Sequence, residues 1–239
     1  MRKLLVFALA GFLAQLVDGS LGMGFGASSS SILLTFGVAP AIVSATVHFS
    51  EIATTAASGT SHWKFENVHY PTMLKLAIPG AISAFLGAAV LTRINANAIK
   101  PLIALFLLSM GVYILYQFIF KHTNEEHHYS GQFGRIRMVL QGAIAGFLDA
   151  IGGGGWGPVN TPLLLSSKKM EPRYVIGTVS ASEFFVTLSA SLSFIVFLGM
   201  THINWLAVIA LSVGGLIAAP ISAYLVKILP INILAICVG

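Results

Sequence analysis

The sequence predicts an all-α polytopic membrane protein made of two homologous halves. Three observations predict it: the composition, the succession of apolar segments, and a glycine-broken stretch that occurs twice. Of the 239 residues, 56% are hydrophobic and 9% are charged, and the mean hydropathy is +0.87. Soluble domains carry roughly a quarter charged residues, and a water-soluble fold with so little charge would expose large apolar patches. A multi-pass protein of the cell (cytoplasmic) membrane is therefore expected.

Eight apolar segments, four on each side of a polar linker, organise the chain. A spanning helix needs about 20 apolar residues. The segments are residues 4–36 (interrupted), 39–58, 71–91, 98–120, 138–165 (interrupted), 174–198, 205–226 and 231–239. We expect a first transmembrane repeat at 1–120, a hydrophilic linker at 121–137 and a second repeat at 138–239, with its last helix incomplete. The N-terminus is similar to a signal peptide, but its cleavage would remove half of a repeated element, so we expect it in the mature protein.

The repeat is clearest in the interrupted segments, GFLAQLVDGSLGMGFGASSSSILL and GAIAGFLDAIGGGGWGPVNTPLLL. Adding 131 to the residue number places Asp18 on Asp149. The same shift places Gly22, Gly24 and Gly26 on Gly153, Gly155 and Gly157. A shift of 132 then places Glu51 on Glu183. Two copies of a broken apolar helix in one chain are typical of transporters with internal repeats.

Two topologies remain open. If all eight segments cross the membrane, both sides carry similar numbers of Lys and Arg. If each interrupted segment enters and leaves on the same side, each half crosses three times and the halves are inverted. With the N-terminus outside, this second topology places inside Lys64, Lys121, Arg135, Arg137, Lys168, Lys169, Arg173 and Lys227, and outside Arg2, Lys3, Arg93 and Lys100. The bias is then eight to four toward the cytoplasm, which the positive-inside rule favours.

The broken helices are the candidate binding site. Glycine-rich backbone at membrane depth must be buried in protein or line a wet cavity, and a half-helix that begins there presents free N–H groups with partial positive charge. Two such ends suit a small anion. The candidate substrate-binding residues are Gly24, Gly26, Ser28, Ser29, Ser30, Gly153, Gly154, Gly155, Trp156, Asn160 and Thr161. The alternative is that the glycines, several of them at GxxxG spacing, serve helix packing alone.

Four carboxylates and one histidine lie inside apolar runs: Asp18, Glu51, Asp149, Glu183 and His48. A charge in the bilayer is costly, so each carboxylate should face a cavity or be protonated. The two aspartates could instead bind backbone N–H groups across their breaks. The two glutamates could link proton to anion movement, or position the second segment of each half through hydrogen bonds. His48 is a candidate proton carrier or a hydrogen-bonded core residue.

Catalysis, metals, cofactors and nucleic acid are not expected. The chain has no Ser–His–Asp order, HExxH or P-loop lysine, so we predict that it is not an enzyme. The polar linker contains His122, Glu125, Glu126, His127 and His128; these could chelate a metal, but a solvated loop is the preferred interpretation. The net charge of +5 lies mostly between apolar runs and indicates orientation, not nucleic-acid binding. The expected partners are a small anion and the lipid bilayer, and the sequence does not define an oligomeric state.

The stretches LVDGSLGMGFG and FLDAIGGGGWGPVNTPLLL, with VSATVHFSEI and VIGTVSASEF after them, resemble the TauE/SafE sulfite exporters, also called the toluene-sulfonate uptake permease family. The resemblance implies a bacterial or archaeal secondary transporter for sulfite, sulfonates, thiosulfate or related anions. Coupling of the anion to a proton is one mechanism that the buried carboxylates would allow. It supplies no matched site residues, so those above rest on chemistry. The alternatives are a channel for small anions or weak acids, and a membrane-embedded enzyme or accessory subunit.

Overall fold

The computed structural model describes residues 2–120 and 133–228, and this part of the chain is helical with no strand. Its elements are α1 (Arg2–Leu21), α2 (Phe25–Thr35), α3 (Pro40–Lys64), α4 (Tyr70–Leu91), α5 (Ala96–Phe120), α6 (Arg135–Gly152), α7 (Trp156–Ser166), α8 (Pro172–Phe197), the 3₁₀ turn η1 (Met200–His202) and α9 (Trp205–Ile228). The metal-binding alternative for the linker and the incomplete last helix fall on residues 121–132 and 229–239, which lie outside the described residues.

Among the residues that the structure describes, five helices are long and apolar enough to cross a membrane: α1, α4, α5, α8 and α9. Their outward faces carry large apolar side chains, among them Leu5, Ile82, Leu105, Leu192 and Ile209, each more than half exposed. Such a surface is stable in lipid and unstable in water. The molecule is therefore a polytopic helical membrane protein, as the composition predicts.

Helix α3 is 25 residues long but more polar than these five helices. It lies against both α8 and α9, and most of its hydroxyl groups, both of its imidazoles and its carboxylate are buried. Thr46, His48, Ser50 and Thr54 are all fully buried. Because their polar atoms cannot meet lipid at low cost, α3 occupies the centre of the molecule and the apolar helices surround it.

The fourth helix of each half of the chain packs on the first and third helices of the other half. Helix α4 lies against α6 and α8, whereas α9 lies against α1 and α3. In the contact of α4 with α6 and in that of α9 with α1, a glycine lets the two backbones approach closely. A Cβ on Gly142 of α6 would overlap the Leu76 carbonyl group of α4, and one on Gly11 of α1 would overlap the Leu211 carbonyl group of α9. The two halves of the chain therefore pack on each other through small-residue contacts, the kind that hold helices together in membranes.

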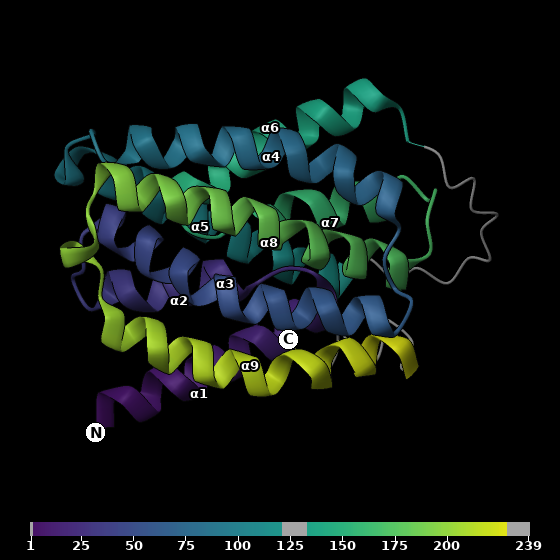
Figure 1. Ribbon diagram of the computed structural model, residues 1–239, viewed down its shortest axis with the longest axis horizontal. Helices are drawn as coiled ribbons and strands as arrows, with labels where there is room; N and C mark the ends of the chain where they lie inside the picture. The colour runs from purple at the N-terminus through teal and green to yellow at the C-terminus, as the bar shows by residue number, and fades with distance from the viewer. Residues whose placement is uncertain (1, 121–132, 229–239) are drawn as a thin grey trace.

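The two interrupted segments enter from opposite ends of the molecule (Figure 1). Helix α1 begins at the end where the N-terminus lies, and α2 returns toward that end. Helix α6 begins at the far end, and α7 returns there (Figure 1). Helices α3, α4 and α5 then cross in alternating directions, as do α8 and α9. The start of α6 and the connection between α7 and α8 lie at one end of the molecule, and the connection between α4 and α5 lies at the other (Figure 1).

Candidate functional site

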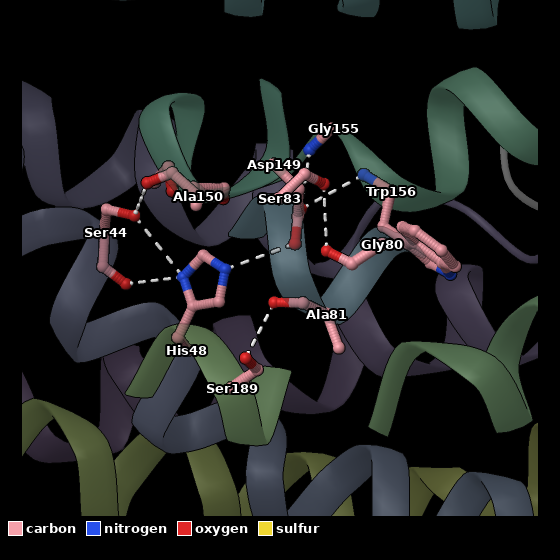
Figure 2. Close-up of polar contacts among 12 residues, drawn as sticks. Ser44, His48, Gly80, Ala81, Ser83, Asp149, Ala150, Gly155, Trp156 and Ser189 are labelled. Carbon is pink, nitrogen blue, oxygen red and sulfur yellow. Dashed lines mark hydrogen bonds and ion pairs between the residues drawn. The ribbon is translucent and has the colours of Figure 1, made fainter. Parts of the chain in front are cut away.

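The interruption between α6 and α7 is closed by one carboxylate. Helix α6 ends at Gly152, and Gly153 adopts a left-handed conformation with φ of 70°, which glycine takes without strain. The Gly153 N–H donates to the Asp149 carbonyl oxygen at 2.7 Å. The Asp149 Oδ1 atom accepts the N–H groups of Gly155 at 2.8 Å and Trp156 at 3.0 Å (Figure 2). The side chain of Asp149 therefore caps the start of α7 from across the break.

The interruption between α1 and α2 begins with the same turn but then follows a different backbone path, since Gly24 has φ of 130° and Gly155 has φ of −103°, and its cap is weaker. Gly22 has φ of 69°, and its N–H donates to the Asp18 carbonyl oxygen at 2.6 Å. The Asp18 Oδ1 atom accepts the Phe25 N–H at 3.5 Å, at the outer limit of hydrogen bonding. The amide hydrogens that the sequence suggested for an anion are thus directed, in this structure, at the protein's own aspartates.

Each break lies against the first turns of the other half's short helix. The Ser30 hydroxyl donates to the Gly153 carbonyl oxygen at 2.5 Å, and the Thr161 hydroxyl donates to the Gly22 carbonyl oxygen at 2.6 Å. A Cβ on Gly154 would overlap the backbone of Ala27. Both breaks are buried, so in this structure the candidate site is closed to either end of the molecule.

His48 of α3 joins the second break to the centre. Its Nδ1 atom lies 2.8 Å from the Ser44 carbonyl oxygen, and its Nε2 atom lies 3.2 Å from the Asp149 Oδ2 atom (Figure 2). The Ser44 hydroxyl donates to the Ala150 carbonyl oxygen at 2.6 Å. Both His48 and Asp149 are buried, with side-chain exposures of 0% and 1%. Sequence reasoning missed this pair, and also Ser44, because the two ionisable residues are 101 positions apart.

Glu51 and Glu183 lie in the same buried centre. Glu51 is 1% exposed and Glu183 is 6% exposed. The Glu51 Oε2 atom has no hydrogen-bond partner among the described residues, and its Oε1 atom lies beside Gly26, 2.9 Å from where a Cβ would stand. Glu51, Glu183 and the two aspartates are close enough to act on one another electrostatically. The structure therefore brings together all four carboxylates that the sequence singles out.

The remaining candidates separate into buried and exposed groups. Asn160 is buried, where its Oδ1 atom accepts the Gln141 Nε2–H at 3.0 Å and its Nδ2 atom donates to the Trp156 carbonyl oxygen at 3.1 Å. Ser29 is buried, and its hydroxyl has no partner among the described residues. Ser28 lies on the exposed face of α2, away from the breaks. Gln141 is a polar neighbour that sequence reasoning missed, since a single amide in an apolar helix carries no recognisable motif.

No group of three or more His, Cys, Asp or Glu side chains in residues 2–120 and 133–228 is placed to hold a metal ion. The buried centre holds carboxylates and one imidazole at separate positions, whereas a metal site needs several ligands that converge on one point.

Long apolar helices around a buried polar centre with two interrupted helices define a multi-pass membrane protein of the transporter class. The chain matches the family model described as sulfite exporter TauE/SafE over residues 7–239. It is 50% identical, over all its 239 residues and 80% of the relative, to "Probable membrane transporter protein YtnM" of Bacillus subtilis (strain 168). It is 27% identical over 112 residues, 47% of this chain and 24% of the relative, to "Sulfite exporter TauE/SafE family protein 3" of Arabidopsis thaliana.

The chain belongs to the TauE/SafE family of membrane transporters, and it is a multi-pass protein of the cell membrane. No solved structure matches it. The family and the membrane class that the sequence motifs indicated are therefore confirmed.

Proposed function

We propose that this protein is a secondary transporter that moves a small sulfur-containing or organic anion, of the sulfite, sulfonate or thiosulfate class, across the cytoplasmic membrane. The family description and the Arabidopsis relative's name point to sulfite. The chemistry of the breaks extends the class to related oxyanions, because two helix N-termini with adjacent hydroxyls offer hydrogen-bond donors. We propose a carrier and not an enzyme, because the candidate groups can bind an anion and can exchange protons.

The two halves are proposed to be inverted repeats, residues 1–120 and 138–239, joined by the linker at 121–137. The single observation that carries this proposal is a pair of equivalent hydrogen bonds, Ser30 to Gly153 and Thr161 to Gly22. Adding 131 to Ser30 gives Thr161, and subtracting 131 from Gly153 gives Gly22, so each bond is the counterpart of the other under the shift. A second pair supports it: the His69 N–H donates to the Thr178 hydroxyl at 2.9 Å, and the Asn204 N–H donates to the Thr46 hydroxyl at 3.4 Å.

Inverted halves explain how the site can open to alternate sides. Because the α1–α2 and α6–α7 hairpins enter from opposite ends (Figure 1), rocking one half against the other would separate one break from its partner helix at a time. The substrate oxygens would then be bound by the amides and hydroxyls of the first turns of α2 and α7, with Trp156 and Phe25 packed beside them. Glu51 and Glu183 would carry protons with the anion or hold α3 and α8 in place.

Proteoliposomes loaded with purified protein test this function. Uptake of radiolabelled sulfite, thiosulfate, sulfoacetate and taurine is measured with and without a pH gradient, against protein-free vesicles. The proposal expects saturable uptake of at least one anion, with accumulation above the external concentration when a gradient is applied. Flux that dissipates a gradient but never accumulates solute would indicate the alternative, a channel for small anions or weak acids. Absence of flux for all four solutes would contradict the proposed function.

A further inference from the structure

The hydrogen bonds of His48 fix how many protons it shares with Asp149. The Ser44 carbonyl oxygen can only accept, so the Nδ1 atom 2.8 Å away carries a hydrogen. The Nε2 atom and the Asp149 Oδ2 atom, 3.2 Å apart, bond only if one proton lies between them. The pair is then either imidazolium with carboxylate or imidazole with carboxylic acid. In both cases the pair has no net charge.

The surroundings give this pair a special place among the buried groups. The ionisable groups around it are Asp18 from α1, Glu51 from α3 and Glu183 from α8. Helices α2 and α7 contribute only hydroxyl and amide side chains to the breaks, and Phe194 of α8 packs on the imidazole with ring centres 5.9 Å apart. Among the buried polar residues of the described part there is no Lys or Arg. His48 is therefore the basic side chain of the centre.

The pair exists in one half of the molecule. The residue equivalent to His48 under the 132-residue shift is Ser180, which is buried and whose hydroxyl has no partner among the described residues. Asp18, the equivalent of Asp149, accepts one long hydrogen bond. A purely structural cap should occur in both copies of a symmetric scaffold. Here one copy has the imidazole and the other has a serine at the equivalent position.

We propose that the His48–Asp149 pair is the proton-binding site of the transporter, and that loading it with one more proton releases the start of α7 for the anion. This inference rests on the proposed function and names the groups that perform its coupling. A second proton makes the pair imidazolium plus carboxylic acid, with a net charge of +1. The added proton lies either on the Oδ2 atom, where it faces the hydrogen on Nε2, or on the Oδ1 atom, where it competes with the Gly155 and Trp156 N–H groups. In both cases the attraction between imidazolium and carboxylate is lost and one set of hydrogen bonds to Asp149 is weakened.

The consequence is an anion site made by protonation. Neutral Asp149 is a weaker acceptor for the Gly155 and Trp156 N–H groups than its carboxylate, so an anionic oxygen can replace it there. The imidazolium of His48 adds a positive charge beside the partial positive charge of the helix start. One proton enters with one negative charge and leaves when the anion is released. Glu51, with its unpartnered Oε2 atom near Gly26, offers the next proton acceptor.

Two near-isosteric substitutions separate proton transfer from structure. In Asp149→Asn the amide oxygen still accepts the two N–H groups, and the amide N–H donates to a neutral His48, so the geometry is kept without a titrating carboxylate. In His48→Gln the side-chain amide keeps a donor toward Asp149 without a titrating ring. His202→Gln is the matched control, because His202 is exposed in η1. Thermal unfolding in detergent checks that all three variants fold as the wild type does.

The measurement pairs gradient-driven accumulation with exchange at equal concentrations on both sides, for labelled sulfite, thiosulfate and sulfoacetate. A pH-sensitive dye inside the vesicles records proton entry with thiosulfate and sulfoacetate. We expect the wild type and His202→Gln to accumulate anion and acidify the lumen. Asp149→Asn and His48→Gln should lose accumulation and acidification to a much greater extent than exchange.

Three results would overturn the inference while leaving the proposed function standing. The first is normal accumulation in both variants. The second is an equal loss of accumulation and exchange in variants of wild-type thermal stability, which would place the pair in binding alone. The third is wild-type accumulation of thiosulfate or sulfoacetate without acidification of the lumen, which needs no variant at all. Wild-type protein that moves none of the three anions would instead contradict the proposed function itself.

Discussion

The two breaks differ, although the proposed repeat of the two halves predicts that they are alike. Their backbones begin and end alike: Gly22 and Gly153 have φ of 69° and 70°, and each is followed by a short helix that starts at an aromatic residue. Between these points they differ, because Gly24 has φ of 130° and Gly155 has φ of −103°. Their electrostatic surroundings do not match. Asp149 accepts two short N–H bonds and contacts His48, whereas Asp18 accepts one N–H at 3.5 Å.

This difference separates what the fold requires from what transport adds. A break in a membrane helix needs a glycine with positive φ and an acceptor for the exposed amides, and both breaks have these. A third partner that titrates is not needed for closure. The second break is therefore the tightly held one, and the first break is the one that can rearrange at lower cost. Substitutions that compare the two breaks test this view.

The largest effect is expected where backbone meets backbone. Gly154→Val would place a side chain on the Ala27 amide, where a Cβ has no room. Overpacking of cores costs about 1–3 kcal/mol, and occasionally more; the upper end is expected here because a rigid backbone and not a flexible side chain blocks the space. We expect loss of monodisperse protein in detergent, or folded protein without anion uptake.

Gly111→Val in α5 is the control for this substitution, since a Cβ there meets nothing within 4 Å. The control should purify and transport as the wild type does. If Gly154→Val also transports with unchanged affinity, the binding site does not lie at the break.

The next effect compares the two aspartates directly. Asp149→Ala removes an acceptor of two N–H groups and leaves His48 without its partner, whereas Asp18→Ala removes one long bond. Hydrogen bonds to charged groups contribute about 1.5–3 kcal/mol each, so Asp149→Ala should destabilise by about 3 kcal/mol and Asp18→Ala by about 1 kcal/mol or less. Thermal unfolding of both variants in the same detergent measures the difference. Equal shifts, or a larger shift for Asp18→Ala, would mean that the two breaks are held equally.

Much of the fold could be predicted from sequence because the bilayer restricts it. Apolar length indicates the spanning helices, and the glycines of residues 22–26 and 153–157 lie at or next to both interruptions. The sequence predicts one more apolar segment at residues 39–58, whereas α3 is a more polar helix with a buried polar face. Its central position depends on the helices that pack around it, which the sequence does not show. The contact of His48 with Asp149 could not be predicted, because a pair 101 positions apart depends on how α3 and α6 cross.

The positions of the candidate residues could be predicted from the sequence, but the contacts of their side chains could not. The glycines, hydroxyls and carboxylates suggested by the pattern do gather at the breaks, except for Ser28, which faces outward. Sequence alone could not show that Asp18 and Asp149 direct their carboxylates at the very amides expected to bind the anion. That competition between an internal and an external anion depends on side-chain conformation, which residue spacing does not determine.

A smaller and equal pair of effects should come from the two cross-half hydrogen bonds. Ser30→Ala and Thr161→Val each leave one buried carbonyl oxygen without its donor, at bonds of 2.5 Å and 2.6 Å. Each should destabilise by about 1 kcal/mol, with similar shifts in thermal unfolding. Unequal shifts would contradict the proposed equivalence of the halves. In the double variant the breaks should separate more readily, which cysteine cross-linking across them can record.

The smallest effect concerns the connections before α4 and α9, where His69 and Asn204 are equivalent. His69 bonds to Thr178 and Thr72, and its pKa is lowered by partial burial and by the nearby charge of Lys75. A lowered pKa in the folded state means that the unfolded chain binds the proton more readily, so this contribution to stability is complete above the ordinary pKa of about 6.5 and is lost as the pH falls below it. His69→Asn copies the second half into the first and should flatten that part of the stability profile between about pH 6.5 and pH 5, measured as the difference in unfolding temperature from the wild type. A difference that does not change with pH would show that His69 acts through its backbone N–H alone.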